Sequence, residues 1–287
     1  MKRKEELKLA GVVTLYNPTD KDIENINTYI DDIDTLYVID NTEGKDNEKR
    51  LPKNKKIIYS FKNENVGVAK ALNIGAEQAK KEGYKWLLTM DQDTTFKKGV
   101  IDKMKEVITK QDMSKIGIVT PWHHTKLIEK KPDTEFDNPH DVMTSGNIIN
   151  LEIHEKIGGF KEWMFIDGID IEYCLNLSKN GYKILRINTI EIEHNLGDLF
   201  YKKVGNRLFL CTNHAAFRRY YIMRNYHYIL DMYKDYDPDY CYRLVSQRHN
   251  IIGVLLFEKN KYKKIRDYIR GLKDYQKGIK GKSPYKD

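Results

Sequence analysis

The stretch Trp86-Leu87-Leu88-Thr89-Met90-Asp91-Gln92-Asp93 joins an apolar run to two carboxylates that leave it together. A short apolar run that ends in polar residues is typical of a buried strand. Residues i and i+2 of an extended segment point to the same side, so Asp91 and Asp93 can converge on one cation. Hard cations such as Mg²⁺ are held by carboxylates together with phosphate oxygens and water. The triplet therefore predicts a metal–diphosphate site, although the same Asp-x-Asp pattern also occurs in solvated turns.

Further strand-like runs lie on both sides of this stretch and alternate with helical patterns. The runs cover residues 9–15, 36–39, 56–59, 86–90 and 116–120, and helical spacing covers residues 21–33, 66–81 and 99–109. This alternation predicts an α/β fold with a mostly parallel central sheet flanked by helices. Ligands of such sheets bind beyond the carboxyl ends of the strands. The loops after the first, second and fourth runs are therefore the places to look for chemistry.

Length and composition indicate a globular protein with a sizeable core. The chain has 287 residues, 40% of them hydrophobic, and three scattered cysteines that fit reduced core thiols. No apolar run approaches the roughly 20 residues that cross a bilayer, and the charged first eight residues are not followed by an apolar signal region. We therefore expect a cytoplasmic protein.

The net charge of +8 is concentrated at the C-terminal end. Residues 258–287 hold eleven Lys or Arg against four Asp or Glu, a net charge of +7, and they follow the apolar segment 251–257. The rest of the chain is close to neutral, which argues against nucleic acid as a partner. We expect a helical, basic extension that either approaches an anionic membrane surface or is simply solvated.

Polar residues follow the first two strand-like runs. Thr14, Tyr16, Asn17 and Pro18 come after the first, and Pro18 is expected to hold Asn17 in an extended conformation. Asp40 ends the second run. It is either an ordinary turn acid or a hydrogen-bond acceptor for a pyrimidine base or ribose.

A segment rich in small residues follows the third run. Asn65 is a plausible N-cap for the helix that begins there, and Gly67 permits the close approach of a ligand. The free backbone donors of the helix start favour an anion, to which Lys70 would add charge unless it is a solvated helix lysine.

Several of these blocks, taken in order, resemble the inverting family-two nucleotide-sugar glycosyltransferases, and within them the rhamnosyltransferase-like group of bacterial polysaccharide assembly. The blocks are residues 12–18, 38–41, 65–69 and 88–93, and the resemblance spans about residues 8–230. It implies a GT-A fold, a nucleotide cradled by the first three blocks, and Mg²⁺ or Mn²⁺ held by Asp91 and Asp93. It also implies a GT-A domain at residues 1–205, whose nucleotide half ends near 120 and whose acceptor half follows, and a helical extension at 206–287.

The resemblance also covers an acceptor side, which begins at residues 144–147. The segment 165–175 is rich in acids, and by resemblance Asp170 lies where the family's catalytic base lies, with Asp167 as the alternative. If a helix begins near Gly168, its dipole keeps these carboxylates ionised, as a base requires. Asp167 is otherwise a helix cap or a ligand of the acceptor hydroxyl, and Glu172 is expected to support the site.

Three further residues are candidates for substrate contact. His194 is in a position where the family often has a histidine, and it would bind metal or diphosphate unless it is structural. Trp163 would stack on a sugar unless it belongs to the core. Arg224, in the helical stretch 218–225, would line the acceptor or diphosphate site unless that helix merely packs on the domain.

These residues together predict inverting transfer of a sugar to a glycan or lipid-linked acceptor, with Asp170 removing the acceptor's proton. The resemblance favours dTDP-rhamnose as the donor. UDP-sugars fit a pyrimidine site equally well, and a module that binds sugar nucleotides or glycans without catalysis is the alternative from another class.

Overall fold

The computed structural model describes residues 7–124, 131–193, 200–204, 207–211, 213–248 and 251–285. The chain forms two compact units. One contains residues 1–161 and 173–195, and the other contains residues 162–172 and 196–287. The acidic segment around Asp167 therefore belongs to the same unit as the C-terminal helices. A division into domains at residue 205 stays a prediction.

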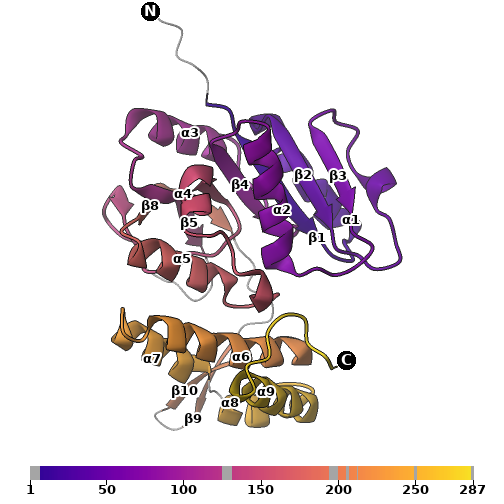
Figure 1. Cartoon of the computed structure of the whole chain (residues 1–287), viewed down its shortest axis with the longest axis vertical. Helices are drawn as coiled ribbons and strands as arrows, with labels where there is room; N and C mark the ends of the chain where they lie inside the picture. The colour runs from indigo at the N-terminus through magenta and orange to yellow at the C-terminus, as the bar shows by residue number, and fades with distance from the viewer. Residues whose placement is uncertain are drawn as a thin grey trace, which may run out of the picture. The chain divides into compact units, whose positions relative to one another are not determined.

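A mixed sheet of eight strands forms the centre of the first unit (Figure 1). Its order is β3-β2-β1-β4-β7-β5-β8-β6. Pairings β1–β2, β1–β4, β2–β3 and β5–β8 are parallel, whereas β7 runs antiparallel to β4 and β5, and β6 to β8. The strands are β1 (Ala10–Leu15), β2 (Thr35–Asp40), β3 (Ile57–Phe61), β4 (Trp86–Asp91), β5 (Ile116–His124), β6 (Phe136–Asp137), β7 (Asn147–Asn150) and β8 (Lys183–Glu193). The predicted α/β fold is confirmed.

Helices accompany this sheet, and the sequence predicts a helical segment near each of them except the one at residues 151–156. They are α1 (Asp20–Asn25), α2 (Val68–Lys81), α3 (Val100–Lys110), α4 (Leu151–Lys156) and α5 (Ile169–Lys179). The single helix predicted over residues 21–33 is wrong. Only α1 is α-helical there, followed by the 3₁₀ turns Ile26–Thr28 and Ile30–Asp32, because Tyr29 has a φ of −141° that an α-helix does not accept.

Helix α2 lies against β1, β2 and β4 (Figure 1). Its small residues Ala69, Ala71 and Ala76 are buried on the side that faces the strands. A Cβ added at Gly75 would lie 2.3 Å from a methyl group of Val12, so only glycine lets the helix come this close to β1. The small residues in this part of α2 therefore serve helix-to-sheet packing.

The second unit is mainly helical. It holds the 3₁₀ turn Glu162–Met164, the first turn of α5 and the hairpin β9 (Phe200–Val204) to β10 (Arg207–Cys211), followed by four helices. These are α6 (Ala216–Tyr233), α7 (Pro238–Arg248), α8 (Ile251–Phe257) and α9 (Lys261–Gln276). The predicted helical extension is confirmed. No helix within the described ranges is both long enough and apolar enough to span a bilayer. Cys174, Cys211 and Cys241 are buried free thiols, as predicted.

Candidate active site

Parallel pairing brings the ends of β1, β2 and β4 into one row. Thr14 of β1 is in register with Asp91 of β4, and Leu15 is in register with Asp40 of β2. These are the carboxyl ends of the strands, where ligands of open α/β sheets bind. The hydroxyl of Thr14 is buried and has no hydrogen-bond partner among the described residues. Such an orphaned polar atom in this row favours a ligand contact.

Gln92, the middle residue of the acidic triplet, ties the loop after β4 to the loop after β1. Its Oε1 accepts a hydrogen bond from the Tyr16 amide at 2.8 Å, and its main-chain oxygen accepts one from Asn25. The extended conformation predicted for Asn17 is wrong, because its φ is 46°. Asparagine tolerates this left-handed conformation, and the Asn17 amide donates to the hydroxyl of Thr42 at 2.9 Å. Tyr16 and Asn17 are both exposed.

Asp40 is enclosed by hydrogen bonds and has an exposed fraction of 0%. Its carboxylate accepts from the Thr42 amide at 2.9 Å, the Asn47 side chain at 2.9 Å and the Tyr59 hydroxyl at 2.7 Å. Burial, and then the bond to Asp40, raises the pKa of Tyr59 far above its usual value. In this arrangement Asp40 shapes the loop after β2.

The start of α2 differs in detail from the prediction. Gly67, with a φ of 87°, is the N-cap residue, so the assignment of Asn65 to that position is wrong. Asn65 acts one step earlier, because its side-chain oxygen accepts from the Gly67 amide at 3.0 Å. No side chain caps this helix. Its first amides therefore remain available to an anion, and Lys70 is exposed on the first turn.

Asp91 and Asp93 lie on a braced turn. The Asp91 amide donates to the hydroxyl of Ser145 at 2.9 Å, and this hydroxyl donates to Thr94 at 2.8 Å. Ser145, in the block that the sequence assigned to the acceptor side, therefore supports the acidic turn. Among the described residues, no three His, Cys, Asp or Glu side chains gather to hold an ion. Two carboxylates still fit Mg²⁺ or Mn²⁺, because a diphosphate and water supply the remaining oxygens.

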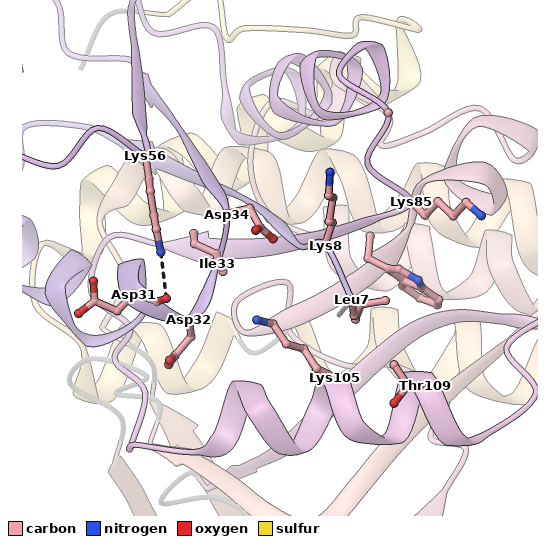
Figure 2. Close-up of a pocket in the computed structure, with 12 residues that line it drawn as sticks. Leu7, Lys8, Asp31, Asp32, Ile33, Asp34, Lys56, Lys85, Lys105 and Thr109 are labelled. Atoms are coloured by element: carbon pink, nitrogen blue, oxygen red, sulfur yellow. Dashed lines mark hydrogen bonds between the residues drawn. The ribbon is translucent and has the colours of Figure 1, made fainter. Parts of the chain in front are cut away.

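A cavity of about 780 Å³ lies at the other ends of the strands, between the start of β1, the start of β4 and α3 (Figure 2). Its walls mix the cations of Lys8, Lys56, Lys85 and Lys105 with three aspartates. Lys56 is already engaged, since its ammonium donates to the Asp31 carbonyl at 2.9 Å (Figure 2). Burial, and then Asp102, raises the pKa of the Asp32 carboxyl. This mixed lining and this location separate the cavity from the row at the carboxyl ends.

In the second unit, the acidic segment begins with a turn in an unusual backbone conformation. Phe165, Asp167 and Gly168 have φ values of 69°, 64° and 81°. Two of the three are not glycine, so the turn stores strain that its surroundings must hold. Strain of this kind is common where a protein fixes a functional group. Here it lies directly before α5, as the sequence predicts for a helix start near Gly168.

Asn225 and Arg224 of α6 hold this turn. The Asn225 amide nitrogen donates to the carbonyl oxygens of Met164, Ile166 and Asp167 at 2.8–2.9 Å. Arg224 has an exposed fraction of 0%, and it donates to the carbonyls of Trp163, Met164 and Gly281. Protein acceptors thus surround the Arg224 guanidinium. We propose that it organises the turn and does not contact a substrate.

Asp167 forms an ion pair with Arg218. The two Asp167 oxygens accept from Arg218 at distances of 2.5–3.2 Å, and the Asp167 side chain is 7% exposed. The Asp167 charge is the main cause of the raised pKa of Arg218. Arg218 also contacts His214, whose pKa falls to about 4 because of burial and the nearby arginine. His214 is therefore neutral near pH 7.

Asp170 lies in the first turn of α5 and is half-buried. One of its oxygens accepts from the Ile171 amide at 2.9 Å. Asp170 contributes to the raised pKa of Arg218, after Asp167, and to that of Arg248, after Tyr226. The carboxylate therefore lies near two guanidinium charges and at the positive end of a helix dipole, which together favour its ionised form.

Two of the remaining candidates, Trp163 and Glu172, are described by the structure, and His194 is not. Trp163 is half-buried and packs edge-on against Tyr228 with ring centroids 5.2 Å apart, while the Lys280 ammonium lies 4.7 Å from its ring. Glu172 is buried and accepts from the Tyr233 hydroxyl at 2.6 Å, in agreement with a supporting role. His194, the third predicted metal ligand, lies outside the described residues.

Sequence reasoning gave no individual role to several residues that build the site. Gln92, Ser145, Arg218 and Asn225 all act through partners that are distant along the chain. A polar residue at a buried position of an otherwise apolar pattern is the available signal. Asn225, which lies between Arg224 and Tyr226 in a helix, gives that signal only once the buried face of α6 is known.

Two solved structures share the architecture of this chain. A GalNAc-T7 structure with UDP, GalNAc and Mn²⁺ matches with a TM-score of 0.60 at 15% identity, covering 96% of this chain and 57% of that one. TarS residues 1–349 of S. aureus, in complex with UDP-GlcNAc, match with a TM-score of 0.56 at 15% identity, covering 95% of this chain and 82% of that one. At these identities the likeness shows the fold.

The family model "Glycosyl transferase family 2" matches residues 21–166. The chain belongs to glycosyl transferase family 2, and it is a glycosyltransferase. It is 26% identical over 302 aligned positions to the dTDP-rhamnosyl transferase RfbF of Shigella flexneri, an alignment that covers 96% of this chain and 98% of that protein.

Proposed function

We propose that this glycosyltransferase transfers rhamnose from dTDP-rhamnose, with inversion, to a hydroxyl group of a glycan or lipid-linked saccharide in cell-surface polysaccharide synthesis. The observation that carries the proposal is the row of Thr14, Asp40 and Asp91 at the carboxyl ends of three parallel strands. The end-to-end similarity to a dTDP-rhamnosyl transferase supports the choice of donor. A UDP-sugar is the second candidate, because a pyrimidine site accepts uridine as readily as thymidine.

The residues of the first unit would bind the donor. Thr14, Tyr16, Asn17 and Pro18 border the nucleotide, and the free amides at the start of α2, together with Lys70, favour its phosphates. Asp91 and Asp93 would hold Mg²⁺ or Mn²⁺, and Gln92 fixes the turn that carries them. A bound divalent ion would neutralise the charge of the leaving nucleoside diphosphate.

The residues of the second unit would prepare the acceptor. Asp170 would remove the proton from the attacking hydroxyl, and the ionised form that this role requires is favoured by α5 and the nearby arginines. The hydroxyl oxygen then bonds to the anomeric carbon as the bond to the diphosphate oxygen breaks. Asp167, held by Arg218, would position the turn and contact the acceptor. Trp163 would stack on a sugar of the acceptor.

A donor screen tests the reaction. The purified chain is incubated with dTDP-rhamnose, dTDP-glucose, UDP-glucose and UDP-GlcNAc, with Mg²⁺, Mn²⁺ or EDTA, and release of nucleoside diphosphate is measured without an acceptor. Many transferases slowly transfer the sugar to water, so donor hydrolysis reports activity without an acceptor. We expect hydrolysis of dTDP-rhamnose to be the fastest and to stop when EDTA removes the metal ion. Faster release of UDP from a UDP-sugar would identify that sugar nucleotide as the donor in place of dTDP-rhamnose. Binding of every donor without release would favour a non-catalytic module.

Asp93→Asn tests the proposed metal site. Loss of an outer-shell partner of a metal typically weakens metal affinity by about 10- to 100-fold. Loss of one of two carboxylate ligands is expected to weaken Mn²⁺-dependent binding of dTDP by at least as much. Calorimetric titration of dTDP at several Mn²⁺ concentrations measures the effect. Asp102→Asn, an exposed aspartate on α3, is the control and should bind as the original chain does. An unchanged metal dependence in Asp93→Asn would remove Asp93 as a ligand.

A further inference from the structure

Helices α8 and α9 pack against each other (Figure 1). The acidic side chains of this region are buried, and several apolar side chains of the two helices are exposed. Glu258, between the two helices, is buried and binds Arg219 at 2.6 Å and Lys264 at 2.8 Å. Asp267 and Asp274 of α9 are buried as well. Asp274 accepts from Tyr220 at 2.8 Å and from Tyr285 at 3.0 Å. The acids of the described tail are thus turned inward and are engaged by protein groups.

The outward face of α8 is apolar. Ile252, Leu255 and Leu256 are exposed at spacings of three and four residues, so they share one side of the helix, and Leu256 is 57% exposed. On α9, Tyr262 is 85% exposed, and Ile269 lies two turns later on the same side. Single exposed apolar residues are ordinary, but five on two helices that pack against each other favour an interaction site.

Seven cations of this region are exposed, whereas Lys264 is buried against Glu258. Exposed basic residues on and around α9 are Lys259, Lys263, Arg266, Lys273, Lys277, Lys280 and Lys282. Because the acidic residues of the described tail are buried, the face that reaches solvent is more basic than the net charge of the segment suggests. Exposed apolar side chains, an exposed tyrosine and exposed lysines in the same region match the chemistry of an anionic bilayer interface.

We propose that the outward face of α8 and α9, formed by Ile252, Leu255, Leu256, Tyr262 and Ile269 with the surrounding lysines, docks on an anionic lipid surface. The apolar side chains enter the boundary between head groups and acyl chains, and the lysines bind the anionic head groups. This surface lies within the second unit, and the inference depends neither on the identity of the donor nor on the reaction. The sequence predicts a membrane contact for the basic tail as a whole, and the proposal assigns this contact to a defined set of residues.

Vesicle sedimentation tests the proposal with the full chain. We expect the protein to sediment with vesicles of phosphatidylcholine mixed with phosphatidylglycerol, and to stay in solution with phosphatidylcholine alone. The triple variant Ile252→Ser, Leu255→Ser, Leu256→Ser should bind the anionic vesicles about tenfold more weakly, since three partly inserted side chains lose apolar contact. Lys259→Glu with Lys263→Glu should weaken binding by about tenfold or more.

Matched controls separate this surface from general charge and hydrophobicity. Ile58→Ser removes an exposed apolar side chain from β3, and Lys55→Glu with Lys81→Glu reverses two exposed charges of the first unit. Both controls should bind vesicles much as the original chain does. A urea unfolding midpoint unchanged in the triple variant would show that the chain remains folded.

Two results would overturn the proposal. Sedimentation of the original chain that is the same with neutral and anionic vesicles would remove the charged lipid surface as the partner. A chain that sediments as a dimer without lipid, and becomes a monomer in the triple serine variant, would assign the face to a second copy of the chain.

Discussion

Replacing Asp170 with asparagine is expected to lower kcat by about 10²- to 10⁴-fold, the usual contribution of a positioned general base. Asparagine has the shape of aspartate but cannot accept the proton of the acceptor hydroxyl at neutral pH. Asp170 lies in the first turn of α5 near Arg218 and Arg248, an environment that favours a carboxylate ready to accept a proton.

The measurement is the rate of sugar transfer to the acceptor, beside calorimetric binding of dTDP. Donor binding should be unchanged, because the donor-binding candidates belong to the first unit. Asp239→Asn is the matched control, since Asp239 is an exposed aspartate in the first turn of α7. A near-normal kcat for Asp170→Asn would exclude this residue as the base and would move the role to Asp167.

Asp167→Asn is expected to lower the free energy of unfolding by about 3 kcal/mol, the lower end of the range for breaking a buried ion pair. The lower end applies because Asp167 is 7% exposed but Arg218 is 35% exposed. The substitution leaves the Arg218 charge without its carboxylate. Asparagine tolerates the φ of 64°, so backbone strain does not add to the effect.

Urea unfolding of the full chain measures this change. Asp20→Asn is the control, because it removes a carboxylate from an exposed ion pair with Arg50 and should leave the midpoint nearly unchanged. Adding Arg218→Gln to Asp167→Asn should recover part of the lost stability if an uncompensated charge is the cause. Normal stability with abolished transfer in Asp167→Asn would instead indicate a direct part in catalysis.

The two substitutions together distinguish the two acids. A base affects kcat without affecting stability, whereas the carboxylate of a buried ion pair affects stability first. The observed pair between Asp167 and Arg218 is the reason to assign the roles in this order. Sequence alone leaves both residues as candidates, because both lie at the start of the same helix.

The sequence by itself determined the alternation of strands and helices up to about residue 120, because burial imposes a period of two or 3.6 on apolar residues wherever an element forms. It also located the acids, since residues such as Asp91 follow a recognisable buried strand. It misassigned the helix over residues 21–33 and the conformation of Asn17, where a local preference gave way to tertiary contacts.

Only the tertiary structure decided which groups meet. Gln92 finds the Tyr16 amide 76 residues away, and Arg218 finds Asp167 at a separation of 51. A hydrogen bond between distant residues depends on the packing of whole elements, which local patterns do not encode. For the same reason, the sequence predicted only the net positive charge of the tail. The fold shows in addition that the acidic side chains of the described tail are buried and that several apolar side chains are exposed.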